Sequence, residues 1–316
     1  MAIDFHKTQV QELLMALHGR SEIPLKLQYL GEGADAFQRL MDNPEYDLAQ
    51  SEFSLIRKTA STIFRKIGNN KVNLVYLGCG TGFKAIPLIK AASKTHTPVN
   101  LLLADISHRM LEICVKEIRK KVRTNLLLQT ALLDFEAGNF AYLTRPLRKN
   151  FYRSNLMFIL GNTLGNLTDR TRILINFRES MATNDYLLIG VELAPKNNTE
   201  IQNMLRRYGG EGNTAILFNV FKNTGIDREH GHFLVTYNRV KNQVECRFQF
   251  DVDAAVKIGS EQVKMRKGQK VLLEISHKFT AAELRKLFKY AGFKIKLFAT
   301  NKNRTYALVL AQPQEL

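Results

Sequence analysis

The sequence predicts an α/β fold in which a mostly parallel sheet is covered by helices on both faces. Apolar runs of strand length alternate with segments of helical periodicity, as repeated strand–helix–strand units require. A sharp glycine turn stands where the first strand meets the first helix of this series, and acidic residues follow the ends of later strands. The expected strands lie near 72–77, 100–104, 126–130, 155–160 and 185–193, and the expected helices near 84–93, 107–121, 139–146 and 168–182.

The glycine turn is the strongest functional signal. The apolar run 72–77 leads directly into Gly78-Cys79-Gly80-Thr81-Gly82, and an amphipathic segment follows from Lys84. Glycines allow positive φ and let a ligand approach the backbone. About twenty-five residues further on, the run 101–104 ends in Asp105, whose carboxylate can accept both hydroxyls of a ribose. Together they predict a Rossmann-like, nucleoside-binding sheet; a glycine turn without a ligand is the alternative.

The details of the turn narrow the choice of nucleoside. A dinucleotide fingerprint needs a third glycine at position 83, where this chain has Phe83, and no Gly-Lys-Ser/Thr phosphate loop occurs. A G-x-G-x-G turn with an acidic strand end resembles the S-adenosylmethionine-dependent methyltransferases. In that superfamily, an acidic residue and its apolar neighbour after the third strand hold the adenine, which corresponds to Asp134 and Phe135. The fourth run ends at Gly161, where the ligand crevice is expected.

Composition limits the classes of function. The 316 residues can form one large domain or two smaller ones, and no apolar run approaches the roughly eighteen residues of a membrane span. We expect a cytoplasmic protein without membrane association. The three cysteines are widely separated, so neither a disulfide framework nor a metal site is expected. The net charge of +17 is compatible with nucleic-acid binding, but the basic residues are scattered and tryptophan is absent. A generally basic surface is the favoured explanation.

The alternating pattern ends near residue 194 and resumes near residue 277. Between these points, helical segments are followed by strand-like runs, which predicts an α+β insertion. Thr280 and Glu283 form a capping-box pattern for a helix, and two further strands close the sheet. We therefore expect a nucleoside-binding domain of residues 53–194 plus 277–316. The second domain, residues 1–52 plus 195–276, would bind the substrate.

Four segments resemble the histidine-specific N-methyltransferase family, whose members trimethylate the α-amine of histidine on the way to ergothioneine. Fungal relatives N-methylate dimethylallyltryptophan in ergot alkaloid synthesis. Segment 158–167 is similar to the family signature F-x-G-S-T-I-G-N-L, and segment 274–279 to its E-x-S-x-K-F pattern. Segment 208–219 resembles Y-x-x-x-G-x-T-A-x-F-N, and segments 26–29 and 43–46 resemble a tyrosine-bearing loop near the substrate. The resemblance covers nearly the whole chain and implies a seven-stranded methyltransferase sheet with an antiparallel last strand.

The resemblance also implies roles for single residues. Asn166 and Tyr208 would bind the carboxylate and amine of an amino acid, Tyr29 would face the amine as the catalytic residue, and Glu274 and Ser276 would bind the side chain. S-adenosylmethionine would be held by Gly78, Cys79, Gly80, Thr81, Lys84, Asp105, Asp134, Phe135 and Gly161, the last of which would also border the substrate. Each substrate residue has a structural alternative: Asn166 as a helix cap, Tyr208 as helix-end packing, Glu274 as a surface partner of Lys278, and Tyr29 as an ordinary loop aromatic.

Three positions depart from the family pattern. Asp47 replaces a substrate-contacting tyrosine, Cys246 stands at the place of a methionine that lines the imidazole pocket, and Asn162 replaces a small residue. Asp47 with Glu274 would favour a cationic side chain or an additional amine. The expected activity is N-methylation of a histidine-like amino acid or derived amine, and the resemblance implies a monomer. The alternative is a larger substrate: a peptide or protein, an alkaloid, or RNA bound through the basic surface.

Overall fold

The computed structural model describes residues 7–43, 47–68, 71–149, 152–222 and 224–314. The chain divides into two compact units. The smaller unit comprises Met1–Asn43 and Pro195–His277, and the larger unit comprises Pro44–Ala194 and Lys278–Leu316. The boundary expected between residues 52 and 53 falls inside the helix α3 (Asp47–Ile67), and the division instead leaves this helix whole.

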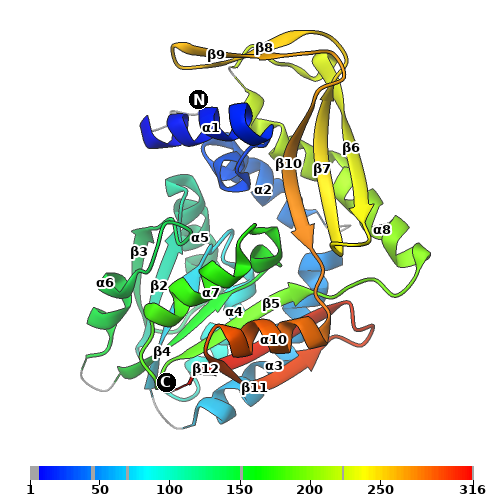
Figure 1. Cartoon of the computed structure of the whole chain (residues 1–316). Helices are drawn as coiled ribbons and strands as arrows, with labels where there is room; N and C mark the ends of the chain where they lie inside the picture. The colour runs from blue at the N-terminus through cyan, green and yellow to red at the C-terminus, as the bar shows by residue number, and fades with distance from the viewer. Residues whose placement is uncertain (1–6, 44–46, 69–70, 150–151, 223, 315–316) are drawn as a thin grey trace. The chain divides into compact units, whose positions relative to one another are not determined.

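The larger unit is built on a seven-stranded sheet of order β11-β12-β5-β4-β1-β2-β3 (Figure 1). The pairs among β1 to β5 are parallel, whereas β12 is antiparallel to both of its neighbours. This arrangement confirms the predicted seven-stranded sheet with an antiparallel closing strand. The strands are β1 (Lys71–Leu77), β2 (Val99–Asp105), β3 (Leu126–Leu132), β4 (Tyr152–Ile159), β5 (Tyr186–Glu192), β11 (Phe293–Thr300) and β12 (Tyr306–Pro313).

The order of the strands locates a ligand crevice. From β1 the chain proceeds outward through β2 to β3, and it then returns to β4 on the other side of β1 before continuing to β5. The direction of winding therefore reverses between β1 and β4. In open α/β sheets, ligands bind outside the carboxyl ends of the strands at such a switch point. The crevice is expected next to Gly78 and Gly161, which follow these two strands.

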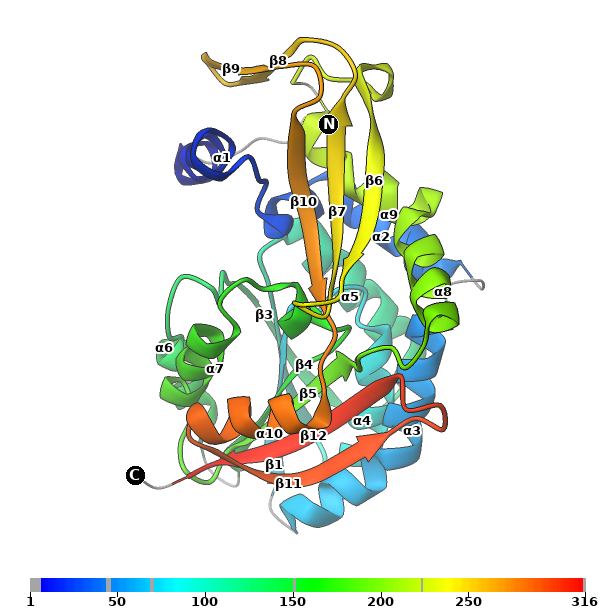
Figure 2. The same ribbon diagram turned by 45° about the vertical axis from the view of Figure 1, so that its right-hand side comes forward.

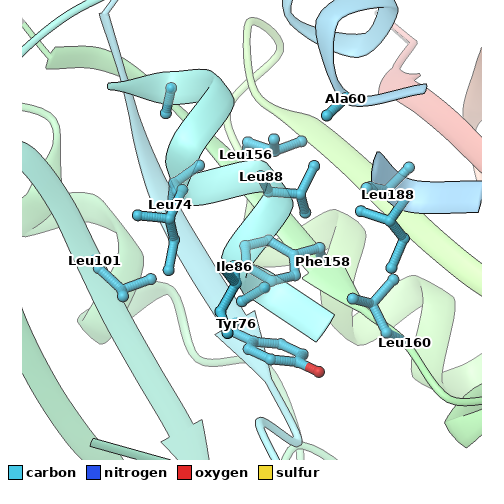
Figure 3. Packing of buried hydrophobic residues seen from close by; sticks show 14 of the residues in the cluster. Ala60, Leu74, Tyr76, Ile86, Leu88, Leu101, Leu156, Phe158, Leu160 and Leu188 are labelled. Atoms are coloured by element: carbon cyan, nitrogen blue, oxygen red, sulfur yellow. The ribbon is translucent and has the colours of Figure 1, made fainter. Parts of the chain in front are cut away.

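Alternating side chains of the strands build a separate core on each face of the sheet. Leu74 and Tyr76 of β1 belong to the core on one face, whereas Val75 and Leu77 belong to the other. Figure 3 shows part of the first core, in which Tyr76 stacks on Phe158 with ring centroids 4.5 Å apart. Helices α3, α4 (Ile86–Ala92) and α5 (His108–Lys121) cover this face, and α6 (Ala141–Thr144), α7 (Arg170–Glu179) and α10 (Ala281–Tyr290) cover the other.

Side-chain caps mark where these helices begin. The Ser107 side chain accepts a hydrogen bond at the start of α5, and the Asp169 side chain does so at the start of α7. At α10, Thr280 and Glu283 form the predicted capping box, in which each side chain bonds the other's backbone N–H group. These caps satisfy amide groups that have no partner within the helix.

The smaller unit contains a three-stranded antiparallel sheet of order β10-β7-β6 (Figure 2). Its strands are β6 (Gly231–Asn238), β7 (Gln243–Phe250) and β10 (Lys270–His277), and a hairpin of β8 (Ala254–Ile258) and β9 (Glu261–Met265) lies between β7 and β10 in the chain. Its helices are α1 (Lys7–Arg20), α2 (Glu32–Asp42), α8 (Asn198–Gly209) and α9 (Glu211–Leu217). Aromatic side chains, including Phe218, Phe221 and Phe248, fill its core.

Short 3-10 helices complete the path of the chain in both units. They are η1 (Leu25–Tyr29), η2 (Phe83–Ala85), η3 (Arg145–Leu147), η4 (Thr163–Asn166), η5 (Asn219–Phe221) and η6 (Arg228–His230). Three of them carry predicted site residues, because η1 ends at Tyr29, η2 contains Lys84 and η4 ends at Asn166. In the described ranges, every helix is too short or too polar to cross a bilayer.

Candidate functional site

The glycine turn after β1 has the geometry expected of a ligand-binding loop. Gly78, Gly80 and Gly82 have φ values of 57°, 52° and 77°, a region that other residues rarely adopt. A Cβ on Gly82 would lie 2.7 Å from the Sγ atom of Cys114, so this glycine is required by packing against α5. A Cβ on Gly78 would lie 3.6 Å from the ring of Phe135. The Phe135 ring therefore lies within van der Waals distance of the position that a Cβ at residue 78 would occupy.

The two other residues of the turn are buried. The side chain of Cys79 is inaccessible to solvent, and burial, followed by its hydrogen bond with Cys114, raises the pKa of the Cys79 thiol. Thr81 is also buried. The Cys79 N–H donates to the carbonyl of Ala104 on β2 at 3.2 Å, which ties the turn to the neighbouring strand. Cys79 and Thr81 therefore offer mainly backbone groups to a ligand.

Asp105 ends β2 and is held by the backbone. Its Oδ2 accepts from the N–H of Gly80 at 3.2 Å, and its Oδ1 accepts from the N–H of Ser107 at 3.1 Å. Only 7% of the residue is exposed, and this burial raises its pKa to about 6. The two hydrogen bonds orient the carboxylate beside the glycine turn and leave it further acceptor capacity.

Asp134 and Phe135 follow β3. The Oδ1 of Asp134 accepts from the N–H of Glu136 at 3.0 Å. The ring of Phe135 lies edge-on to Phe177 of α7, with the centroids 5.8 Å apart. The structure thus brings Phe135 next to Gly78, as two residues that face one ligand would require.

Lys84 and Gly161 also lie close together, and both contact Glu52, a residue that the sequence analysis did not single out. The Lys84 ammonium lies so close to Gly161 that a Cβ there would be 2.8 Å from Nζ. Lys84 forms an ion pair with Glu52 of α3, with Nζ 2.6 Å from Oε2. The only sequence signal for Glu52 is a carboxylate on the apolar side of an amphipathic helix, between Leu48 and Leu55.

Asn162 and Asn166 have different structural positions. Asn162 has a φ of 60°, and its buried side chain accepts from the N–H of Glu192 at 2.9 Å. This side chain therefore anchors the loop after β4 to β5. Asn166 is partly buried at the end of η4. The alternative role of Asn166 as the cap of α7 is wrong, because Asp169 is the cap: its Oδ1 accepts from the N–H of Arg172 at 2.9 Å.

The smaller unit gathers three predicted substrate residues. The Tyr208 hydroxyl on α8 lies 2.7 Å from the Ser276 hydroxyl on β10. Two residues before Ser276, Glu274 accepts a hydrogen bond from the Asn213 amide at 3.1 Å, and the same amide donates to the Tyr208 carbonyl at 3.0 Å. Residues two apart in a strand share a face of the sheet. Tyr208, Glu274 and Ser276 are therefore parts of one polar cluster, which Asn213 joins.

The structure also places other residues that were predicted to bind the substrate. Cys246 pairs with Glu274 across β7 and β10 and is completely buried. Tyr29, at the end of η1, packs edge-on against Phe37 of α2 with ring centroids 5.5 Å apart. Lys278 is buried in the larger unit and pairs with Glu192, so it is not the surface residue that the alternative for Glu274 assumed. Residues 44–46 and the side chain of Asp47 lie outside the described residues.

Comparison with known proteins assigns the chain to a family. Residues 6–313 match the family model described as "Histidine-specific methyltransferase, SAM-dependent". The chain belongs to this family. It is therefore an enzyme, a methyltransferase that depends on S-adenosylmethionine.

Relatives with curated names agree with this assignment. The "Histidine N-alpha-methyltransferase" of Mycolicibacterium smegmatis is 22% identical over 303 residues, which cover 92% of this chain and 89% of that protein. The "Ergothioneine biosynthesis protein 1" of Neurospora crassa is 25% identical over 190 residues, which cover 59% of this chain and only 21% of that protein.

A solved structure supports the fold. The magnesium protoporphyrin IX methyltransferase of Synechocystis PCC 6803, crystallised with bound SAH, is 12% identical and has a TM-score of 0.51. The match covers 92% of this chain and 98% of that chain.

The residues at the switch point fit S-adenosylmethionine. A nucleoside with a free ribose needs an acceptor for its hydroxyls, and Asp105 presents an oriented carboxylate beside Gly80. An adenine needs an apolar surface, and the Phe135 ring lies beside Gly78 of the turn. Both features are at the carboxyl ends of neighbouring strands, where the topology of the sheet locates the ligand crevice.

Proposed function

We propose that the protein methylates the α-amine of an amino acid whose side chain carries an N–H group, with histidine as the first candidate. The observation that carries this proposal is the polar cluster of Tyr208, Asn213, Glu274 and Ser276 in the smaller unit. A buried carboxylate can accept a hydrogen bond from an imidazole N–H group, and a neighbouring hydroxyl can donate one to the second ring nitrogen. The name of the M. smegmatis relative supports histidine.

The larger unit would hold the methyl donor. Asp105 would accept the ribose hydroxyls, Asp134 and Phe135 would contact the edge and face of adenine, and the backbone of the turn from Gly78 to Thr81 would line the nucleoside. Lys84 and Gly161 would border the methionyl end. S-adenosylmethionine supplies a methyl group that its sulfonium charge already activates, so the protein mainly contributes placement.

The smaller unit would select and orient the amino acid. Glu274 has one oxygen bonded to Asn213, which fixes the carboxylate so that it can accept an N–H group of the substrate. Ser276 and Tyr208 share a hydrogen bond, and either hydroxyl can turn toward a ligand. Asn166, in the larger unit, remains proposed as a donor to the substrate carboxylate.

Tyr29 is the proposed catalytic residue. Only a neutral amine can attack, whereas a free amino acid near neutral pH is mostly an ammonium ion, so a proton must leave first. The Tyr29 hydroxyl would accept a hydrogen bond from the amine, orient its lone pair and relay that proton to water. Residues that hold the amine in line with the methyl group can together supply roughly 7–11 kcal/mol of the barrier reduction.

A more cationic amino acid is the second candidate. Cys246 stands across from Glu274 in the sheet and is smaller than the methionine that the family resemblance implies at this position. A shorter side chain beside a buried carboxylate favours a longer, charged substrate side chain. The expectation that Asp47 favours a cationic side chain or an additional amine remains a prediction.

Calorimetry and turnover distinguish these candidates. Histidine, arginine, lysine and a diamine would be titrated into the protein saturated with S-adenosylhomocysteine, and methylated products from S-adenosylmethionine would be measured by mass spectrometry. The proposal predicts that histidine binds most tightly, and that Glu274→Gln weakens it about tenfold or more. Glu261→Gln, on the exposed part of β9, is the matched control. Tighter binding of arginine, lysine or the diamine would favour the second candidate, and no product from any of them would contradict both.

A further inference from the structure

A carboxylate is buried beneath the switch point of the sheet. Glu52 lies on the inward side of α3 and is 0% exposed. Its Oε1 accepts hydrogen bonds from the N–H of Gly161, at 2.8 Å, and from the Tyr306 hydroxyl. Its Oε2 faces the Lys84 ammonium at 2.6 Å. The carboxylate therefore connects α3, the segment after the glycine turn, the end of β4 and the start of β12.

The sheet is shaped to accommodate this cluster. A Cβ on Gly190, in the middle of β5, would lie 2.6 Å from Glu52 Oε1 and 2.5 Å from the Tyr306 hydroxyl. Gly190 thus leaves the volume that the two polar groups occupy. Glycine in a strand interior commonly marks such a close approach. Glu52 is therefore part of a built site.

Stability alone is a weak explanation for such a cluster. Buried ion pairs are frequently no more stable than apolar residues of similar volume, because both charges lose their hydration. The groups that Glu52 holds are more informative, since Gly161 and Lys84 border the expected ligand crevice. Gly161 has a φ of 79°, and a Cβ on this residue would lie 2.8 Å from the Lys84 Nζ atom.

We infer that Glu52 is a positioning residue for the amino-acid end of S-adenosylmethionine. Its carboxylate holds the Lys84 ammonium and the Gly161 backbone in place, so that the ammonium can pair with the carboxylate of the methionyl group. Glu52 also offsets the charge of Lys84 next to a ligand that carries a sulfonium. This inference rests on the proposed cofactor site and adds a residue that does not itself touch the ligand.

Two ligands separate this role from a general effect on folding. S-adenosylhomocysteine has the amino-acid group, whereas 5′-methylthioadenosine has the same nucleoside and a thioether without it. A residue that positions only the amino-acid end should affect the first ligand and not the second. A loss of folding would weaken both ligands equally.

The test is calorimetric titration of both ligands into the full chain and its Glu52→Gln variant. We expect roughly tenfold or greater loss of affinity for S-adenosylhomocysteine and less than a twofold change for 5′-methylthioadenosine. Glu179→Gln, on the exposed side of α7, is the control and should change neither affinity. An equal loss for both ligands, or no loss for S-adenosylhomocysteine, would overturn the inference.

Tyr306→Phe provides a second test if Glu52→Gln fails to fold. This variant removes one hydrogen bond to Glu52 and keeps the ion pair with Lys84. The same selectivity is expected at about two- to fivefold, and loss of affinity for both ligands would count against the inference. A wild-type protein that bound neither ligand would instead overturn the cofactor assignment itself.

Discussion

Asp105 should lower the stability of the ligand-free protein at neutral pH. Burial raises its pKa from the ordinary value of 3.8 to about 6, despite hydrogen bonds from Ser107 and Gly80 that act in the opposite direction. Between these two values the folded state binds more protons than the unfolded state. The free energy of unfolding therefore falls as the pH rises through this range.

The size of the effect follows from the shift. A difference of about 2.2 pKa units corresponds to about 3 kcal/mol when the whole range is crossed. Between about pH 5 and about pH 7.5, the Asp105 contribution to the free energy of unfolding should fall by about 1.4 kcal/mol. Asp105→Asn removes this titration. It also removes one of the two acceptor oxygens, but that loss is nearly the same at both pH values.

The measurement is urea unfolding, followed by circular dichroism, of the wild type and Asp105→Asn at both pH values. The stability loss between the two should be about 1.4 kcal/mol smaller in the variant. Asp42→Asn, at the exposed end of α2, should retain the wild-type pH dependence. Equal pH dependence in Asp105→Asn and the wild type would refute the burial argument. The variant should also bind S-adenosylhomocysteine more weakly.

Three further predictions concern packing and the polar cluster. Gly82→Ala should lower the free energy of unfolding by about 2 kcal/mol or more, because residue 82 has a positive φ and its Cβ would collide with α5. In the same urea unfolding experiment, Gly138→Ala should change it by less than about 0.5 kcal/mol, because a Cβ there has no neighbour within 4 Å. Equal effects of the two substitutions would contradict this prediction. A double-mutant cycle of Tyr208→Phe and Ser276→Ala should give a coupling of about 1 kcal/mol, and additivity would exclude a stabilising bond. Asn213→Ala should raise KM for the amino acid severalfold in steady-state assays without changing the calorimetric Kd of S-adenosylhomocysteine, and a weaker cofactor would contradict its assigned role.

Local signals determine the part of the fold that the sequence predicts well. Inner strands of the large sheet, such as β1 and β5, are mostly apolar runs because both of their faces are buried. The glycine turn and the capping box of α10 are encoded by neighbouring residues. The residues around the switch point could likewise be predicted, because each of them stands at or just after the end of a strand. Asp105, Phe135 and Gly78 meet because the carboxyl ends of parallel strands share one edge of the sheet.

Long-range contacts explain what the sequence did not predict. The strand-like runs of the insertion do not reveal their partners: β9 pairs with β8 through the turn at Gly259-Ser260, whereas β10 pairs with β7, which precedes that hairpin in the chain. Gly259 has a φ of 61°, which suits a two-residue hairpin turn.

The buried charges are a second group of long-range contacts. Glu52 lies 109 residues before Gly161 and 254 before Tyr306 in the chain, and Glu192 lies 86 residues before Lys278. Sequence periodicity places each carboxylate on an element but does not identify its partner. Only the assembled sheet shows that Glu52 belongs beside the expected cofactor crevice.

The most direct test of the central claim is to locate the transferred methyl group. The protein would be incubated with histidine and S-adenosylmethionine carrying a 13C-labelled methyl group, and the product would be examined by heteronuclear NMR. The account predicts a labelled methyl group on the α-nitrogen of histidine. A methyl group on a ring nitrogen, or no transfer by a protein that still binds S-adenosylhomocysteine, would contradict it.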